Sequence, residues 1–522
     1  MGERQRLQRV PNVKNPVYES KCVHDCNCFR SRNLVKASMA TNLTVNILDL
    51  ADGLPDNWLM GCDSREFSRI VDRLFQEITQ NQARETPPKI CLAEPEPVQF
   101  LASFTAARAA KCPIFLCNPN WVKPEWQQVF DLVQPDLILG QVAELEQRFP
   151  FLTFRAAGLR SCDRVASEFS SPEFREIDEL TAIMIPTGGS SGKIRFAIHT
   201  WDTLTASVQG FQQYFQVDKI NSFCVLPLYH VSGLMQFMRS FTTAGKLAIG
   251  SFKALEAGEK CEIEPEEFFI SLVPTQLQRL LQNPDTANWL GRFRAVLLGG
   301  APAWPELLET ARNYQIKLAP SYGMTETASQ IATLKPEDFL AGNNSSGQTL
   351  PHAQITIRSA KGDILCYNKI GNIAINAKSL ALGYYPEQFG DGQYLQLDDL
   401  GFFDKNNCLN IVGRSSDKII TGGENVFPAE VEAVVRSTNL VADIAVIGLP
   451  DKDWGQVVTA IYVPANSEVT VKNLQAAIED KLSKFKRPKS WVIVEHLPRN
   501  SQGKVNREQL QEIAIVSSSV NR

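Results

Sequence analysis

Short apolar segments alternate with longer amphipathic segments between residues 43 and 180. The predicted strands are 89–93, 113–116 and 137–139, and the predicted helices are 67–82, 97–110 and 124–132. Strands separated by helices of about 10–15 residues are typical of a parallel sheet with helices on both faces. The pattern therefore predicts an α/β subdomain.

The same alternation resumes at residue 181 and continues to residue 333. The predicted strands are 181–185, 223–226, 247–249, 269–272, 295–298 and 316–318, and the predicted helices include 201–216, 233–243, 274–282 and 305–313. Binding sites in such sheets lie beyond the carboxyl ends of the strands. Polar clusters follow four of the predicted strands, at 187–195, 227–233, 299–302 and 321–326, so we expect the site there.

Two further changes of pattern divide the rest of the chain. Between about residues 347 and 413, short apolar runs separated by Gly, Asp and Asn predict a small antiparallel β unit. After Arg414 the pattern predicts helices at 428–437 and 471–482 and strands at 445–447, 458–463 and 491–494. The expected fold is α/β: a large N-terminal domain (39–414) of two α/β subdomains plus the small β unit, followed by a small α+β C-terminal domain (415–522).

The composition is that of an ordinary globular protein, because 44% of the 522 residues are hydrophobic and 21% are charged. A formal net charge of −4 gives no indication of binding to nucleic acid or to an anionic membrane. No apolar run reaches the roughly 18 residues that a membrane span needs. Twelve cysteines without a repeating framework indicate free thiols in a reducing compartment, so we expect a cytoplasmic protein.

Residues 1–38 differ from the rest, because they are rich in basic side chains and show no hydrophobic periodicity. They predict a disordered tail, or translated upstream sequence with Met39 as the true start. An organelle transit peptide, which would place the protein in a plastid, is the third interpretation. Transit peptides are rich in serine, and serine is sparse here.

The segment 186–195, with the sequence PTGGSSGKIR, follows a predicted strand and precedes a predicted helix. Glycine lets backbone N–H groups approach an anion closely, hydroxyls donate hydrogen bonds, and Lys193 and Arg195 supply positive charge. The segment is not a Walker A loop, because three residues separate its outer glycines and Ile194 stands in place of Ser or Thr. It predicts a phosphate-binding loop or, alternatively, a flexible surface loop.

Seven motifs follow one another along the chain. They are TGGSSGK at 187–193, PLYHVSG at 227–233, GGAP at 299–302, SYGMTE at 321–326, LDDLG at 397–401, GRSSDKIITGGENVFPAEVE at 413–432 and PRNSQGK at 498–504. Together they resemble the adenylate-forming superfamily of acyl-CoA synthetases, luciferases and peptide-synthetase adenylation domains, over roughly residues 43–507. Within it, YGMTETASQIATL at 322–334 and GGENVFPAEVE at 422–432 are most similar to the o-succinylbenzoate–CoA ligases of menaquinone and phylloquinone synthesis.

The resemblance implies that a substrate carboxylate attacks the α-phosphate of ATP, with Mg²⁺ as cofactor and coenzyme A as co-substrate. Charge builds up on phosphoryl oxygens, so cations, a metal and backbone donors act on it. By resemblance, Thr325 binds the α-phosphate and Glu326 holds Mg²⁺; a structural carboxylate at a helix start is the alternative for Glu326. The expected nucleotide-binding residues are Thr187, Gly188, Gly189, Ser190, Ser191, Gly192 and Lys193 for the β- and γ-phosphates, Gly299, Gly300, Ala301, Pro302, Tyr322 and Gly323 on the adenine side, and Asp399 and Arg414 for the ribose.

Three positions link the two predicted domains to this chemistry. Asp398 stands where the family usually has Gly, so the ribose ligand is Asp399 or its neighbour. The resemblance implies that the C-terminal domain is mobile and that it carries Lys504 into the site during adenylation; an exposed loop lysine is the alternative. The implied hinge lies near Ser416, where many relatives carry Asp or Lys.

The acyl side of the site is implied by the segment after 227. By resemblance, His230 lies beside the carboxylate and the later thiol attack, with Ser232 and Gly233 next to the substrate; a structural histidine is the alternative. Arg239 lies among apolar residues of a predicted helix and needs an anion or a path to solvent. The resemblance implies that it anchors the second carboxylate of an aromatic dicarboxylic acid, and a structural salt bridge is the alternative. Five cations at 481–489 predict contacts with the phosphates of coenzyme A or a solvated helix end.

Three functions follow from these observations. The first is an AMP-forming acid–CoA ligase of the o-succinylbenzoate type, or a ligase for another carboxylic acid. The second is a stand-alone adenylation module that loads a carrier protein. The third is a non-catalytic ATP-binding protein, which Lys504, Glu326 and the intact phosphate loop argue against. The pattern predicts no oligomeric state.

Overall fold

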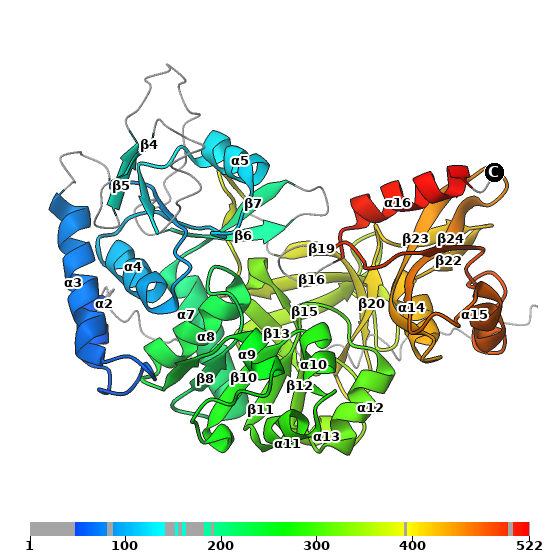
Figure 1. The fold of residues 1–522 in the computed structure, drawn as a ribbon, viewed down its shortest axis with the longest axis horizontal. Helices are drawn as coiled ribbons and strands as arrows, with labels where there is room; N and C mark the ends of the chain where they lie inside the picture. The colour runs from blue at the N-terminus through cyan, green and yellow to red at the C-terminus, as the bar shows by residue number, and fades with distance from the viewer. Residues whose placement is uncertain are drawn as a thin grey trace, which may run out of the picture. The chain divides into compact units, whose positions relative to one another are not determined.

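The structure, a computed structural model, describes residues 47–80, 87–140, 152–154, 159–162, 182–188, 193–390, 394–499 and 505–520 (Figure 1). Within these residues the strands form four sheets accompanied by helices, which confirms the predicted α/β class. The predicted tail at 1–38, the loop residues 189–192 and Lys504 lie outside the described residues.

The first sheet contains the strands predicted for the N-terminal region, but it is mixed rather than parallel throughout. Its order is β18 (Glu387–Gln388), β17 (Gly383–Tyr384), β7 (Ile194–His199), β6 (Ile183–Gly188), β2 (Ile114–Leu116), β1 (Ile90–Leu92), β3 (Leu137–Leu139), β5 (Leu159–Cys162) and β4 (Leu152–Phe154). β1, β2, β3 and β6 are parallel, whereas the remaining pairs are antiparallel. The helices of this region are α2 (Ile47–Asp52), α3 (Ser64–Gln80), α4 (Pro97–Ala109) and α5 (Lys123–Val133).

The second sheet is parallel in its middle and turns back at one edge. Its order is β14 (Gln348–Thr349), β13 (Ser329–Thr333), β12 (Leu318–Met324), β11 (Ala295–Leu298), β10 (Phe268–Leu272), β8 (Asn221–Cys224) and β9 (Leu247–Ile249). β9, β8, β10, β11 and β12 are parallel, so the segments that follow β8 and β11 leave the sheet at the same edge. β12, β13 and β14 are antiparallel.

Three helices of this second region begin at the predicted residue, namely Trp201, Pro274 and Pro305. The helices of the region are α7 (Trp201–Phe215), α8 (Val231–Thr242), α9 (Phe252–Glu256), α10 (Pro274–Leu280), α11 (Pro284–Arg292), α12 (Pro305–Asn313) and α13 (Pro336–Leu340). Proline at the first helical position has no N–H to leave unpaired, and it opens α10 and α12 as predicted. α7 and α8 pack against each other, and α8 also packs against β8.

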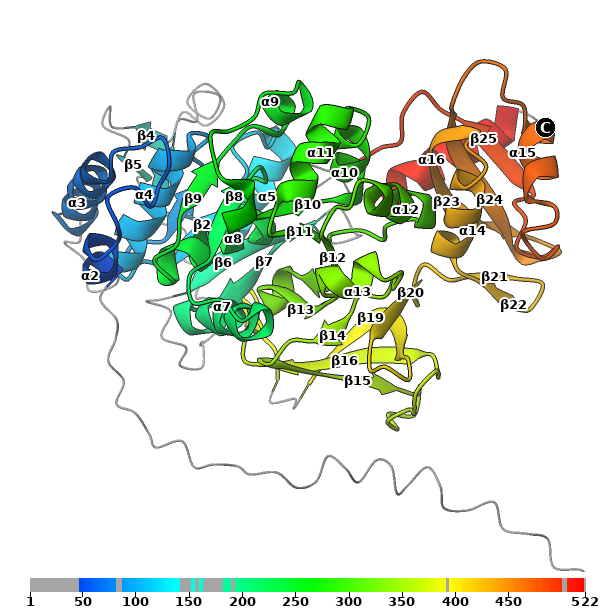
Figure 2. The ribbon, with the colours of Figure 1, turned by 90° about the horizontal axis from the view of Figure 1, so that it is seen from below.

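The third sheet is the predicted antiparallel β unit (Figure 2). Its order is β15 (Ala353–Arg358), β16 (Gly371–Ala377), β19 (Leu395–Phe403) and β20 (Leu409–Arg414). All three pairings are antiparallel, and apolar residues of β15 and β16 are buried. In β15 the buried residues alternate with less buried ones, which is typical of a sheet with one face against the core.

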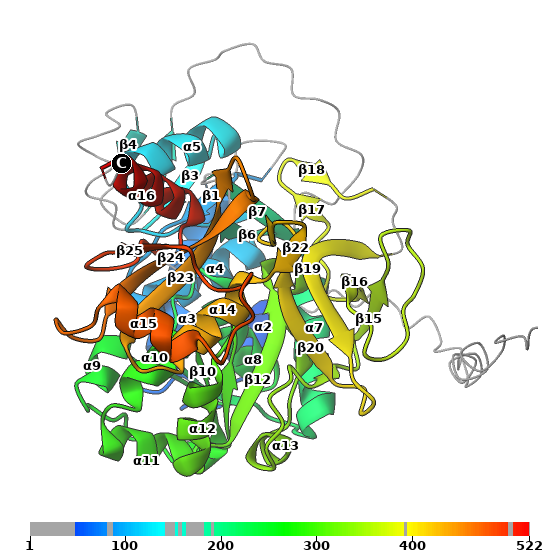
Figure 3. The ribbon, with the colours of Figure 1, turned by 90° about the vertical axis from the view of Figure 1, so that its right-hand side faces the viewer.

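The fourth sheet belongs to the predicted C-terminal domain (Figure 3). It contains β22 (Glu424–Val426), β21 (Ile419–Thr421), β24 (Gly455–Pro464), β23 (Val441–Asp451) and β25 (Ser490–Ile493), with α14 (Pro428–Arg436), α15 (Val471–Ile478) and α16 (Arg507–Val520). Its buried apolar side chains form clusters made of residues 419–514, among those described. A separate core is expected of a separate domain, and the boundary at 414/415 remains a prediction.

One apolar core joins the first two sheets. Helices α4, α7 and α8 contribute to it together with side chains of β1, β2, β6, β10 and β11. Trp58 lies edge-on to Phe67, at 5.3 Å between ring centroids, and to Phe241 of α8, at 5.7 Å. These ring contacts fix the position of α8, which carries much of the predicted acyl pocket.

Candidate active site

The motif SYGMTE lies within a β-hairpin, which corrects the prediction that it follows a strand. Ser321–Met324 is the second half of β12, Thr325–Thr327 forms a 3₁₀ turn, and the chain returns as β13. The predicted strand ended at Leu318 because Pro320 and Gly323 interrupt the apolar pattern. Gly323 is required by the hairpin, since a Cβ there would lie 2.1 Å from the carbonyl oxygen of Ser329.

Each backbone carbonyl from Thr325 to Ala328 accepts a hydrogen bond from a remote segment. The donors are His199 Nε2 to Thr325 (2.8 Å), the Ala381 amide to Glu326 (2.8 Å), Ser379 Oγ to Thr327 (2.9 Å) and Ser207 Oγ to Ala328 (2.7 Å). Thr325 and Glu326 are themselves buried. The turn is therefore held in one conformation before any ligand binds, as a site that stabilises developing charge requires.

His199, which the sequence analysis missed, is a buried histidine that stays neutral. Its Nε2 donates to Thr325, so its Nδ1 accepts from the hydroxyl of Thr203 at 3.0 Å. Burial lowers the pKa of His199 to about 4, despite the hydrogen bond to Thr325, which raises it. Protonation would place a charge in the core and remove the acceptor from Thr203.

We therefore expect the domain around His199 to lose stability as the pH falls from about 6.5 to about 4. The unfolded histidine takes up a proton near pH 6.5 and the folded one only near pH 4, so the stabilisation is present above this window and is lost within it. For one fully buried histidine the loss is about 3 kcal/mol. Urea unfolding at a series of pH values should show a shallower pH dependence in His199→Gln than in the wild type. Equal slopes would contradict the assignment, and the exposed His496→Gln serves as the control.

Glu326 presents a buried carboxylate to this turn. The hydroxyl of Tyr384 donates to its Oε1 at 2.5 Å, and the guanidinium of Arg195 lies over the Tyr384 ring at 4.3 Å. Burial, with the charge of Glu326, raises the pKa of Tyr384, so the phenol remains a donor. Glu326 forms no ion pair with any described side chain, and no described backbone N–H of the turn donates to it. Glu326 lies in the first turn of the 3₁₀ helix, as the helix-start alternative requires, but its described partner is a phenol rather than a cation, so the carboxylate stays able to bind a cation.

Asp399 and Arg414, the residues predicted for the ribose, lie opposite each other, because the middle of β19 pairs with the end of β20. Tyr322 Oη donates to Asp399 Oδ2 at 2.6 Å, and Arg414 Nε lies 3.2 Å from Asp399 Oδ1. Burial, with the charge of Asp399, raises the pKa of Tyr322. Asp399 is thus oriented by two neighbours, both of them predicted site residues.

Asp398 has a different partner, which separates its role from that of Asp399. Its carboxylate accepts hydrogen bonds from the amide of Ser416 at 3.2 Å and from the Ser416 hydroxyl, and its carbonyl accepts from the Ser415 amide at 2.8 Å. The two positions at which the chain departs from the family pattern are therefore in direct contact. This engagement of Asp398 at the predicted hinge favours Asp399 for the predicted contact with the ribose.

The predicted phosphate loop connects two antiparallel strands rather than a strand and a helix. Thr187 and Gly188 end β6, and Arg195 pairs with Thr187 from β7, so Arg195 belongs to a strand. The apolar pattern does not predict β7, because the polar start of this strand resembles the loop. Lys193 is exposed at the edge of the loop, while 189–192 lie outside the described residues. Gly299 to Pro302 follow β11 directly, as predicted, and Gly300 has a φ of 84°.

The segment after β8 forms the start of α8. His230 is the N-cap residue, and its buried ring lies 4.5 Å from that of Tyr229. Ser232 is half-buried in the first turn. Gly233 is required there, since a Cβ would lie 2.2 Å from the carbonyl oxygen of Pro227. The helix begins at Val231, two residues before the predicted start.

Arg239 is a buried cation without an acidic partner in the described part of the chain. Its side chain is in contact with β13, because a guanidinium nitrogen donates to Gln330 Oε1 at 3.1 Å and to Ser329 Oγ at 3.3 Å. The guanidinium lies 4.4 Å from the centre of the Phe211 ring, the residue is 2% exposed, and Nε has no hydrogen-bond partner among the described groups. Burial lowers the pKa of Arg239 to about 9, which still leaves it charged at pH 7. No acidic side chain among the described residues pairs with Arg239, which argues against the alternative of a structural salt bridge.

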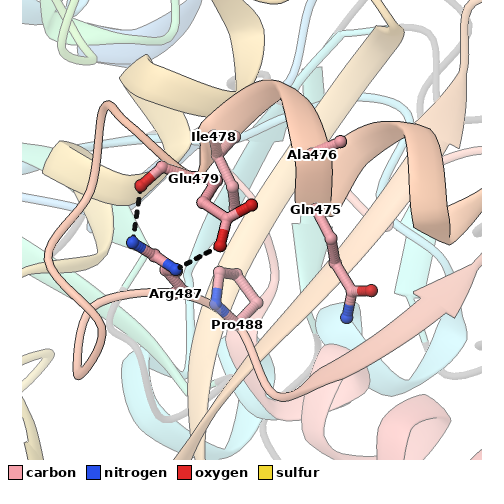
Figure 4. Close-up of a pocket in the computed structure, with 6 residues that line it drawn as sticks. All are labelled: Gln475, Ala476, Ile478, Glu479, Arg487 and Pro488. Carbon is pink, nitrogen blue, oxygen red and sulfur yellow. Dashed lines mark hydrogen bonds and ion pairs between the residues drawn. The ribbon is translucent and has the colours of Figure 1, made fainter.

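Four of the five predicted cations at 481–489 are engaged by protein groups, Lys481 through a hydrogen bond to Ser437 Oγ at 3.3 Å. Arg487 donates to the carbonyl and the carboxylate of Glu479 at the edge of a pocket of about 370 Å³ (Figure 4). Lys486 pairs with Glu430 at 2.5 Å, and the Lys489 ammonium lies 2.9 Å from the centre of the Trp454 ring. These contacts leave fewer of the cations available to the phosphates of coenzyme A and so favour the alternative of a helix end that binds no ligand.

The chain matches the family model for AMP-binding enzymes over residues 65–385 and the model for the AMP-binding enzyme C-terminal domain over residues 430–504. It therefore belongs to the family of AMP-binding enzymes, which confirms the predicted adenylate-forming superfamily. Among the described residues, no helix is long and apolar enough to cross a membrane. No group of three or more described His, Cys, Asp or Glu residues could hold a metal ion.

Two similar enzymes and one similar solved structure point to the same activity within this family. The 2-succinylbenzoate–CoA ligase of Listeria monocytogenes serovar 1/2a is 33% identical over 459 residues, which is 86% of this chain and 93% of that protein. The 2-succinylbenzoate–CoA ligase of Enterococcus faecalis is 32% identical over 65% of this chain and 70% of its own length. The structure of o-succinylbenzoate CoA synthetase from Bacillus subtilis, in complex with its acyl-adenylate intermediate, superposes with a TM-score of 0.74 at 25% identity and covers 89% of this chain and 98% of that one.

Proposed function

We propose that this enzyme is an AMP-forming acid–CoA ligase that adenylates 2-succinylbenzoate and transfers the acyl group to coenzyme A. In the first step a carboxylate oxygen attacks the α-phosphorus of ATP, and pyrophosphate leaves. In the second step the thiol attacks the acyl carbon, and AMP leaves. The products are 2-succinylbenzoyl-CoA, AMP and pyrophosphate.

The nucleotide end of the proposed site is built on the 325–328 turn. We propose that Thr325 contacts the α-phosphate and that Asp399, oriented by Tyr322 and Arg414, accepts from the ribose hydroxyls. Residues 187–193 would receive the β- and γ-phosphates, and 299–302 would face the adenine.

Glu326 is the residue that would hold Mg²⁺, because its carboxylate has no cation among the described side chains. Magnesium commonly takes one or two carboxylates and completes its shell with phosphates and water, which fits a site without a cluster of protein ligands among the described residues. The ion would neutralise charge on the phosphates when bound.

The observation that carries the choice of acid is Arg239. A desolvated cation with an unsatisfied Nε is costly unless an anion binds it, and its partners Ser329 and Gln330 follow the 325–328 turn directly. An aromatic acid with two carboxylates could place one at the phosphate and the other at Arg239. The names of the relatives support this choice of acid. At the other end of the substrate, the reacting carboxylate would lie beside His230, Ser232 and Gly233.

Pyrophosphate release with candidate acids, with and without coenzyme A, tests the proposal. We expect release with 2-succinylbenzoate and formation of a thioester that depends on coenzyme A. Activity with another acid but none with 2-succinylbenzoate would overturn the substrate, and acyl transfer to a carrier protein but not to coenzyme A would overturn the ligase.

Arg239→Gln should raise the KM for 2-succinylbenzoate at least about tenfold while leaving the KM for ATP nearly unchanged. Breaking a buried charge pair costs about 2–5 kcal/mol, and the tenfold expectation is the low end of this range discounted for solvent that enters the mutant site. A monocarboxylic analogue should respond little to the same change. The matched control is Arg294→Gln, since Arg294 also lies over an aromatic ring, that of Phe269 at 5.7 Å. If both acids were affected equally, Arg239 would be structural.

A further inference from the structure

His352 is a second polar side chain whose ring has no hydrogen-bond partner in the described part of the chain, and like Arg239 it packs on α7. It directly precedes β15, and the amide of Lys378 donates to its carbonyl oxygen at 3.2 Å. Its ring packs on the backbone of α7, because a Cβ at Gly210 would lie 1.8 Å from Nδ1. Both ring nitrogens are buried, and neither has a hydrogen-bond partner among the described residues.

The ring of His352 and the guanidinium of Arg239 pack on consecutive residues of α7, His352 against Gly210 and Arg239 at 4.4 Å from the centre of the Phe211 ring. Burial, followed by the positive charge of Arg239, lowers the pKa of His352 to about 4. A neutral imidazole carries one N–H donor and one acceptor, and Arg239 Nε is a further buried donor without an acceptor among the described groups. Buried donors are almost always satisfied in native proteins, and unsatisfied ones call for an explanation. Two such donors from two different elements would both be satisfied by one anion.

We propose that His352 and Arg239 together bind the distal carboxylate of the acyl substrate, with an imidazole N–H and the guanidinium donating to its oxygens. This inference deepens the proposed function and rests on it. His352 is then a specificity-determining residue: it has no part in adenylation, and it favours acids with a second carboxylate. At pH 7 the imidazole of His352 is a neutral donor, so it can bind the carboxylate without placing a second cation in the core. Gly210 leaves the space that the ring needs.

The test compares His352→Phe, which removes the donor, with His352→Gln, which keeps an amide donor of similar reach. We expect His352→Phe to raise the KM for 2-succinylbenzoate about tenfold or more, as loss of a hydrogen bond to a charged group does. His352→Gln should recover most of that affinity. The kcat with 2-succinylbenzoate, the KM for ATP and the KM for a monocarboxylic analogue should change less than about twofold in both variants. His496→Phe, at an exposed histidine, is the matched control.

A second readout follows from the charge of the ligand. Among the described residues, Arg239 on α8 is the charged group that shifts the pKa of His352, and its positive charge opposes protonation of the ring. A carboxylate bound there would favour the imidazolium, so binding near pH 5.5 should take up protons. Calorimetry of 2-succinylbenzoate binding with a non-hydrolysable ATP analogue, in two buffers of different ionisation enthalpy, should show this uptake in the wild type and not in His352→Gln.

The outcomes separate this inference from the proposed function. A wild-type enzyme that does not turn over 2-succinylbenzoate overturns the proposed function. A wild-type enzyme that does so, while His352→Phe leaves its KM unchanged and the proton uptake persists in His352→Gln, overturns only the role of His352. Equal losses with the monocarboxylic analogue would make His352 a packing residue and would overturn it as well. Melting temperatures of both variants identify any loss that is due to unfolding.

Discussion

Glu326→Gln is expected to lower the rate of adenylation about 100- to 1000-fold, the range seen when one preorganised charge-stabilising group is removed. Glutamine has nearly the same shape and can still accept from Tyr384, so the turn at 325–328 should keep its conformation. It cannot supply the negative charge that a magnesium ion needs. The loss should therefore fall on the pyrophosphate-releasing step.

Rapid-quench measurement of pyrophosphate at several magnesium concentrations checks this expectation. Part of the rate should return at high magnesium concentration if the carboxylate binds the ion. Glu94→Gln, at a half-buried glutamate before α4, should leave the rate unchanged. A loss below about tenfold, independent of magnesium, would show that Glu326 has a structural role.

Lys504→Ala is expected to lower acyl-adenylate formation by a similar factor and to spare thioester formation from adenylate that is supplied ready-made. The resemblance implies that this lysine neutralises the α-phosphate in the first step alone, and a compact ammonium on a flexible stem suits such a role. The described residues on either side are paired: Arg499 with Val505 through a β-bridge, and the Asn506 amide with the Pro498 carbonyl at 2.8 Å.

The two half-reactions can be measured separately with radiolabelled pyrophosphate exchange and with synthetic acyl-adenylate. Lys484→Ala, at an exposed lysine of the same predicted domain, is the control. Equal loss of both half-reactions would contradict a role restricted to adenylation.

The sequence predicted most helices of the fold and many of its strands, since these carry their own signals. α12 has the bounds that Pro305 and its amphipathic pattern predict, and the antiparallel unit at 353–414 follows from its short apolar runs. β7 and β13 were missed because polar residues interrupt their apolar pattern, and tertiary pairing with β6 and β12 decides their conformation.

The residues of the candidate site that belong to a sequence motif could be predicted. The residues that contact the 325–328 turn from distant parts of the chain could not. Glu326, Asp399 and Arg239 stand in recognisable segments. His199, Ser379 and Tyr384 act on the same turn from 126, 52 and 58 residues away. Nothing in their local sequence distinguishes them from ordinary core or loop residues, because their role exists only in the folded chain.

The contact between Asp398 and Ser416 limits how this enzyme can be recombined with its relatives. The two residues lie on opposite sides of the predicted boundary at 414/415, so a chimera that joins the two domains from different parents would separate the pair. A relative that contributes an aspartate at 416 would place two carboxylates together, and one that contributes a glycine at 398 would leave Ser416 without its acceptor. Chimeras of this family should therefore exchange residues 398 and 416 as a unit, wherever the junction is placed.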